Sequence, residues 1–308
     1  MSSKYTNMSA KKVKRDLSEN HCRHLSRDYI QNLGQSVGEA IEKEEGRIPY
    51  TIPVDIADIQ SVSIGRDGTT MHIVGDGYRE TMNGTISFHD KEGKRLHTIY
   101  LANAPEYGKE SFDYRLSKEI EGVKFLLRNK EVKYIGLADG AKDNWSFLKP
   151  YTDISLIDYW HACEYLTKAS KASSRSAYER KQWLLGAREK LLHEHQGAEE
   201  LLEQMKKFRR KQKLSKVAKE NLKTAITYFT NHVHQMDYAL HSENNLPVGS
   251  GVTEAACKVI TKQRCCQSGM KWKIDGAQKT LVMRALYHTD GRWEQFWTFI
   301  DNFGFSLN

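Results

Sequence analysis

Apolar residues follow two different spacings along this chain, and the change between them divides it into regions. Residues 25–46 carry apolar side chains three or four positions apart, which is the spacing of one helix face. Those positions are Tyr29, Ile30, Leu33, Val37 and Ile41. From residue 61 the pattern changes to short apolar runs, which predict strands. The predicted strands are residues 61–66, 81–89, 96–101, 132–138 and 154–157, with a hairpin turn at 90–93, a helix over 111–129 and a brief helix over 145–148.

Strand patterns stop after residue 161, and charged helical patterns fill residues 162–246. A block of this length is too long for a loop, so it predicts an all-helical insertion domain. The segments predicted from these changes are a helical region (1–46), a linker (47–60), the first part of a catalytic core (61–161), the insertion (162–246), the second part of the core (247–290) and a C-terminal amphipathic helix (291–308).

The N-terminal region reads as a short basic helix, a turn and a longer helix that starts at Ser26 and Arg27. Ser26 is a suitable N-cap for the longer helix. This pattern is typical of a helix-turn-helix, whose second helix enters the DNA major groove, and Arg27 would then contact DNA. The alternative is a plain helical hairpin that packs on the core.

The order of the elements predicts the fold class. Three strands, a helix, a strand, a helix, a strand and further helices are the order of an RNase H-like α/β domain. We therefore expect a mixed sheet whose first strand is central and whose fourth strand lies beside the first. The helical insertion would interrupt this domain, and the helical N-terminal region would precede it.

Composition and charge favour a nucleic-acid partner. The 308 residues carry a formal net charge of +8, an excess that suits a polyanion, with DNA preferred to a membrane surface. The five cysteines are irregularly spaced without a Cys-x-x-Cys pair, so we expect reduced thiols and no zinc site. The N-terminus has no apolar signal core and no apolar stretch is long enough for a membrane span, so we expect a cytoplasmic, nucleoid-associated protein.

Three carboxylates stand at positions where structure alone does not require them. Asp67 and Asp139 each follow an apolar strand run and precede a glycine, and Glu254 opens a helix after a glycine-rich turn. One such aspartate alone is more often a turn former. Three together on this fold predict a site for two Mg²⁺ ions about 3.5–4 Å apart, which is the arrangement of phosphoryl-transfer enzymes. Ser250 would be the N-cap that places Glu254 in the first helical turn.

Other residues are candidates for contacts around these acids. Asp158 and His161 lie three positions apart at the start of the insertion, where His161 would be near the metals; alternatively, Asp158 only caps the helix. The following cations would contact phosphates unless they form a solvated basic face, and Trp272 among them would stack on a base unless it is buried. They are Lys258, Lys262, Arg264 and Lys271.

Several short motifs carry a resemblance to a known family. They are Ile64-Gly-Arg-Asp67-Gly-Thr, Gly77-Tyr-Arg-Glu80-Thr-Met-Asn-Gly84, Leu137-Ala-Asp139-Gly-Ala, Asp158-Tyr-Trp-His161, Pro247-Val-Gly-Ser-Gly-Val-Thr-Glu254 and the tail from Cys257 to Ala277. In these blocks, scattered over residues 60–290, the chain resembles bacterial insertion-sequence transposases of the ISKra type. These are DDE transposases whose RNase H-like core carries an all-helical insertion. Tyr78 departs from the pattern, which has Trp before the Arg-Glu pair.

The resemblance implies the catalytic and metal-binding roles of Asp67, Asp139 and Glu254. It also implies an Asp-x-x-His element at Asp158 and His161, two Mg²⁺ or Mn²⁺ ions per site, and double-stranded transposon ends and target DNA as substrates. A homodimer or higher multimer would hold two DNA ends. Two alternatives stay open: a catalytically silent or truncated transposase-derived DNA-binding regulator, and an RNase H-like structure-selective nuclease.

Overall fold

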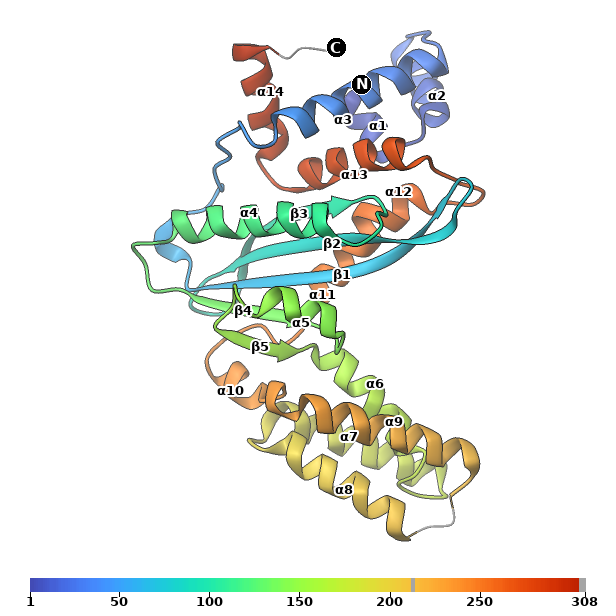
Figure 1. Cartoon of the computed structure of the whole chain (residues 1–308), viewed down its shortest axis with the longest axis vertical. Helices are drawn as coiled ribbons and strands as arrows, with labels where there is room; N and C mark the ends of the chain where they lie inside the picture. The colour runs from blue at the N-terminus through green and yellow to red at the C-terminus, as the bar shows by residue number, and fades with distance from the viewer. Residues whose placement is uncertain (212–213, 305–308) are drawn as a thin grey trace.

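The chain folds around one five-stranded sheet with helices on both faces. The computed structural model describes residues 1–211 and 214–304, and it places the N- and C-terminal helices beyond one side of the sheet and a helical block beyond the other (Figure 1). The predicted insertion (162–246) and C-terminal helix (291–308) include residues 212–213 and 305–308, which lie outside the described residues. None of the described helices combines the length and apolar character that a membrane span requires.

The sheet is mixed, with strand order β3-β2-β1-β4-β5. β1 pairs with β2 and β2 with β3 in antiparallel fashion, whereas β4 is parallel to β1 and β5 is parallel to β4. The predicted central position of the first strand, with the fourth beside it, is therefore confirmed. The strand bounds are β1 (Ser61–Ile73), β2 (Gly77–His89), β3 (Arg95–Asn103), β4 (Lys133–Ala138) and β5 (Ile154–Ile157).

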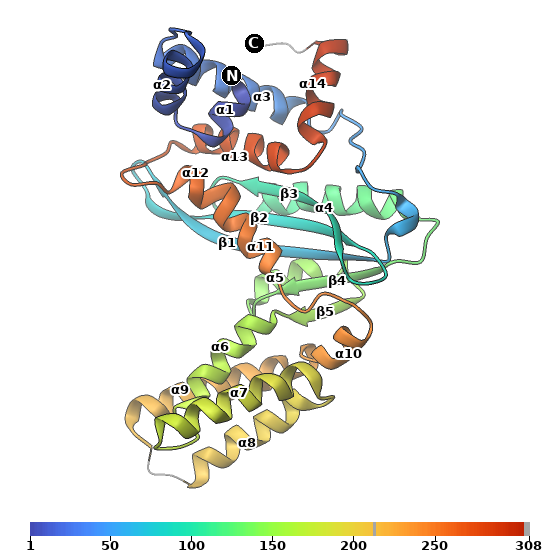
Figure 2. The ribbon, with the colours of Figure 1, turned by 180° about the vertical axis from the view of Figure 1, so that it is seen from behind.

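Helices cover the two faces of the sheet (Figures 1 and 2). Alternation along β1 separates the faces, because Val62 and Ile64 pack with the core under α4 while Met71 and Ile73 pack with residues of α13 and the preceding helix. One face carries α4 (Glu110–Leu126) and α5 (Lys142–Leu148). The other carries α11 (Gly251–Ala256), η3 (Cys257–Lys262), α12 (Gln263–Cys265) and α13 (Ile274–His288).

The N-terminal helices form one core with the C-terminal ones. Ser26 caps the third helix as predicted, since its hydroxyl accepts a hydrogen bond from the Tyr29 backbone N–H at 3.0 Å. The apolar stripe of that helix packs with Val282 and Met283 of α13 and with Phe296, so this region shares a core with the end of the chain. A short helix, η1 (Ile56–Asp58), follows in the linker. The bounds are α1 (Ser2–Asn7), α2 (Ala10–His21), α3 (Arg27–Glu44) and α14 (Arg292–Phe303).

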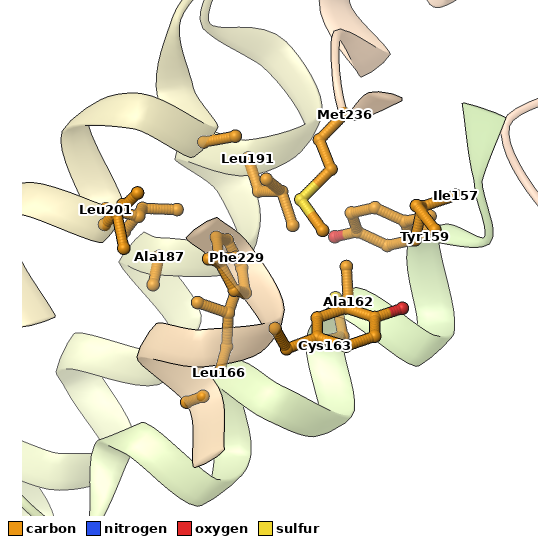
Figure 3. Packing of buried hydrophobic residues seen from close by; sticks show 14 of the residues in the cluster. Ile157, Tyr159, Ala162, Cys163, Leu166, Ala187, Leu191, Leu201, Phe229 and Met236 are labelled. Carbon is orange, nitrogen blue, oxygen red and sulfur yellow. The ribbon is translucent and has the colours of Figure 1, made fainter. Parts of the chain in front are cut away.

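The regular elements of the described residues between β5 and α11 are all helices. Their core continues into the edge of the sheet, because Leu156 and Ile157 of β5 belong to the same buried cluster as Leu166 and Phe229 (Figure 3). The helical block is therefore packed directly on β5. Its elements are α6 (Tyr159–Ser170), α7 (Ala177–His193), α8 (Gly197–Lys211), α9 (Lys216–His232), η2 (Val233–Gln235) and α10 (Tyr238–Glu243).

Candidate active site

Asp67 lies inside a strand, and its prediction as a strand-end residue is wrong. β1 continues for six residues beyond it, to Ile73, because its antiparallel pairing with β2 extends from Ser61 to the turn before Gly77. The pairing of β1 with β4 stops earlier, at Gly65 opposite Leu137. Asp67 thus lies where the sheet narrows from five strands to three, beside the end of β4.

Asp139 lies at the equivalent position of the neighbouring strand. It directly follows β4, and both acids are two residues beyond the last β1–β4 pair. Parallel strands in register bring such residues to the same end of the sheet. Burial raises the pKa of Asp67, and the charge on Asp139 raises it further. The structure therefore brings together the two acids that the sequence separates by more than seventy residues.

A buried network that the sequence analysis missed orients Asp139. Asn144 in α5 donates from Nδ2 to Asp139 Oδ1 at 3.0 Å, and the Ala141 backbone N–H donates to the same oxygen at 3.0 Å. Asn144 in turn accepts from Arg66 Nη1 at 2.7 Å. Arg66 is only 1% exposed and also binds Asp113 of α4 through two hydrogen bonds. The position of Arg66 directly before Asp67 was the signal available in the sequence.

Glu254 stands on the helix that covers the α13 face of the sheet, the face on which the Asp67 side chain lies. Its helix, α11, docks where Gly65 leaves room: a Cβ on Gly65 would lie 1.9 Å from Thr253 Oγ1. Thr253 and Thr85 of β2 share a buried hydrogen bond of 2.7 Å between their hydroxyls. These contacts fix the first turn of α11, where Glu254 stands as predicted. The Cys257 thiol, three residues beyond Glu254, donates to Asp67 Oδ2 at 3.4 Å, so this helical segment lies against Asp67.

Asp158 joins the helical block to the Glu254 helix. It is fully buried at the start of α6, where its Oδ1 accepts from the His161 backbone N–H at 2.8 Å. Its Oδ2 accepts from both the backbone N–H and the hydroxyl of Ser250, the latter at 2.9 Å. Ser250 is the residue before α11, as predicted, but its side chain binds Asp158 instead of capping the helix.

His161 lies between the helical block and the acids. Its Nε2 is 3.6 Å from Glu254 Oε1. Asp158, His161 and Glu254 each offer a ligand atom within 4.8 Å of the others, so this group could hold a metal ion. Three hydrogen bonds already engage the Asp158 carboxylate. Among the described residues, the carboxylate oxygens of Glu254 and Oδ2 of Asp139 accept no hydrogen bond and are therefore the more available metal ligands.

The electrostatics of these acids favour a bound cation. Burial raises the pKa of Asp67, and the Asp139 charge adds to this effect, although the Gly68 N–H and the Cys257 thiol stabilise the carboxylate. Burial also raises the pKa of Glu254, followed by the charge of Asp158, while His161 acts in the opposite direction. Carboxylates collected in this way repel one another, and a divalent cation would remove that repulsion.

The predicted DNA-contacting residues divide into exposed and buried ones. The lysines Lys258, Lys262 and Lys271 are exposed, as is Arg27 at the start of α3, and Trp272 is partly buried. Arg264, which the sequence predicted to contact a phosphate, is buried instead. The residue is only 2% exposed, and its guanidinium lies over the Tyr5 and Trp272 rings at 5.4 and 5.1 Å, so it is not available to a phosphate.

The helix after Glu254 has an unusual geometry. Residues Cys257–Lys262 form a π-helix, so Lys258 and Lys262 do not follow Glu254 at α-helical spacing as predicted. Buried Arg284 donates to the carbonyl oxygens of Val259 and Ile260, to the latter at 2.6 Å. Such wide turns occur often at functional sites, and here one directly follows a candidate catalytic acid.

The five cysteines, which the sequence predicted to be unpaired, are all free.

No protein-family model and no curated protein matches this sequence. The interpretation of the site therefore depends on its geometry.

Proposed function

We propose that this protein is a metal-dependent DNA transposase of the DDE type, with Asp67, Asp139 and Glu254 as its catalytic acids. The observation that carries the proposal is their convergence. One acid comes from the central strand, one follows the end of its parallel neighbour, and one stands on a helix that packs on the face where the Asp67 side chain lies. Carboxylates that converge in this way repel one another, which is unfavourable unless a cation is bound.

The strand order supports an RNase H-like core. Three antiparallel strands followed by two parallel ones, with the first in the centre, match the expected order β3-β2-β1-β4-β5. The helices between β5 and α11 would then be the all-helical insertion that the resemblance implies. This insertion would help to complete the site, because it begins with Asp158 and His161.

The donor set fits Mg²⁺ or Mn²⁺, because it consists of carboxylates with a histidine nearby and no thiolate. Asp67, Asp139 and Glu254 would hold the ions. A divalent cation bound there would neutralise charge on the attacked phosphate and supply the nucleophile at neutral pH. His161 would hold Glu254 in place and donate a hydrogen bond to the scissile phosphate.

DNA would lie against the exposed cations around the acids. Lys258 and Lys262 stand on the π-helix that follows the Glu254 helix, and Lys271 stands on the loop beyond it. Arg27 at the start of α3 would contact a transposon end if the N-terminal helices bind DNA. Phosphate contacts of this kind position the duplex without reading its sequence.

A cleavage assay tests the proposal. Double-stranded DNA carrying candidate element ends is incubated with the protein in Mg²⁺, Mn²⁺ or EDTA, and nicked and joined products are separated. We expect products only with a divalent cation, and their loss in Asp139→Asn with DNA binding retained. Asp301→Asn, an exposed carboxylate on α14, is the matched control. Metal-dependent cleavage that survives in Asp139→Asn would contradict the assignment, and DNA binding without any cleavage would favour a regulator.

A further inference from the structure

Two open cavities, of about 390 and about 860 Å³, lie apart from the three acids. The larger one begins at Gly140, directly after Asp139. It is lined by Gly140, by Lys142, Trp145 and Lys149 around α5, and by His232 and His234 at the end of α9. We propose that this larger cavity, named here the α5–α9 groove, binds a single strand of DNA that passes the catalytic acids. The inference rests on the proposed function and deepens it by adding a strand-binding site.

The charge of the groove suits a phosphodiester backbone. Its lining contains two lysines and two histidines but no carboxylate. Among the described residues, neither Lys142 nor Lys149 forms an ion pair or a side-chain hydrogen bond, so both ammonium groups are available to an incoming anion. Unpaired cations along a groove are the feature that lets a protein follow a nucleic-acid backbone without sequence preference.

The groove continues from the catalytic acids. Gly140 follows Asp139 directly, and a Cβ at Gly140 would lie 2.8 Å from His232 Nε2 and 2.7 Å from Tyr228 Cε2. The end of α9 therefore approaches the backbone of the acid-bearing loop very closely. A strand whose phosphate lies at Asp139 has its next nucleotides beside Gly140 and the His232 side chain.

The size of the groove selects a single strand. A volume of about 860 Å³ is in the range of small-molecule and cofactor sites and holds a few nucleotides. A B-DNA duplex, whose major groove alone is about 12 Å wide, does not enter a space of this size. Besides the cations, Ser146 and Ser155 supply hydroxyl groups, and partly buried Trp145 supplies an aromatic wall.

The test is binding of a fluorescent single-stranded oligonucleotide in EDTA, measured by anisotropy at several salt concentrations. Replacing both lysines (Lys142→Gln with Lys149→Gln) removes two phosphate contacts, so the slope of log K against log salt falls in magnitude by about 1.4, at roughly 0.7 per contact on single strands. Lys219→Gln with Lys223→Gln, exposed on α9 but outside the groove lining, changes the net charge equally and leaves the slope near that of the wild type.

A second variant tests the space and not the charge. Asn231→Trp, at an exposed groove position, narrows the groove, so it should weaken single-strand binding several-fold with an unchanged salt slope. An unchanged slope in the double lysine variant, or equal losses for duplex and single strand, would overturn the inference. Because this assay contains no metal and leaves the acids intact, its failure is separate from a failure of metal-dependent cleavage.

Discussion

Asn144 holds Asp139 by a 3.0 Å hydrogen bond from its side-chain amide. The carbonyl oxygen of the same amide accepts from Arg66, which is buried beneath the sheet and bound to Asp113 and Asp143. The amide therefore cannot rotate without losing one of its two partners. One candidate catalytic acid is in this way fixed to the helices that cover the far face of the sheet.

Replacing Asn144 should weaken metal binding at the site. Asn144→Ala leaves the Asp139 carboxylate free to rotate, and loss of such an orienting partner typically costs about 10–100-fold in metal affinity or activity. We expect a higher Mg²⁺ concentration for half-maximal cleavage, measured by titration of the ion in the cleavage assay. Asn129→Ala, an exposed asparagine after α4, is the control. Equal Mg²⁺ requirements in both variants would show that the bond does not orient Asp139.

Replacing Asp67 should stabilise the metal-free protein. The folded-state pKa of Asp67 is raised, so its ionisation opposes folding, and the resulting loss of stability develops as pH rises through that pKa. At neutral pH in EDTA, Asp67→Asn is therefore expected to melt at a higher temperature than the wild type. Added Mg²⁺ should raise the melting temperature of the wild type more than that of the variant. A lower melting temperature of the variant in EDTA would mean that the Gly68 and Cys257 hydrogen bonds stabilise the protein more than burial and repulsion of the Asp67 charge destabilise it.

The sequence predicted much of the fold because each strand contains an apolar run and clear turns separate several of these runs. β5 was predicted with its observed bounds, and the turn at Asp90–Gly93 forms with Gly93 at a positive φ of 77°. The length of β1 was underestimated, because residues 67–73 lack a continuous apolar run. Pairing with β2 across a long ribbon keeps these residues in a strand, and such pairing cannot be recognised in one segment alone.

The candidate acids were predictable from their local settings, whereas their supports were not. Asp139 and Glu254 follow recognisable element ends, but Arg66 and Asn144 become partners only when α5 folds back under β1. Arg264 shows the opposite case. Its place in a basic segment suggested a surface residue. In the fold, its guanidinium instead donates to the carbonyl oxygen of Tyr5 in α1, a residue more than 250 positions away.

The substitution Gly65→Ala should displace the Glu254 helix on the sheet. The Cβ of Gly65→Ala would overlap the Thr253 hydroxyl, so α11 must shift, and overpacking of this kind costs about 1–3 kcal/mol. We expect a lower free energy of unfolding in urea and a larger loss of cleavage than the lost stability explains. Gly122→Ala is the matched control, since its Cβ meets nothing within 4 Å on α4 and should stabilise the protein by about 0.5–1 kcal/mol. Full activity of Gly65→Ala would show that the position of α11 tolerates the shift.

Acid should destabilise the fold through His288, the last residue of α13. Burial lowers the pKa of His288 to about 4, with a smaller contribution from Arg284, so the folded protein holds this imidazole neutral. The unfolded chain binds the proton at the ordinary pKa of about 6.5, and stability therefore falls as pH decreases from about 6.5 through about 4. Urea unfolding at several pH values should show a weaker dependence over this window in His288→Gln, whereas His193→Gln, at an exposed histidine, should follow the wild type. The same slope in all three proteins would exclude His288 as the source.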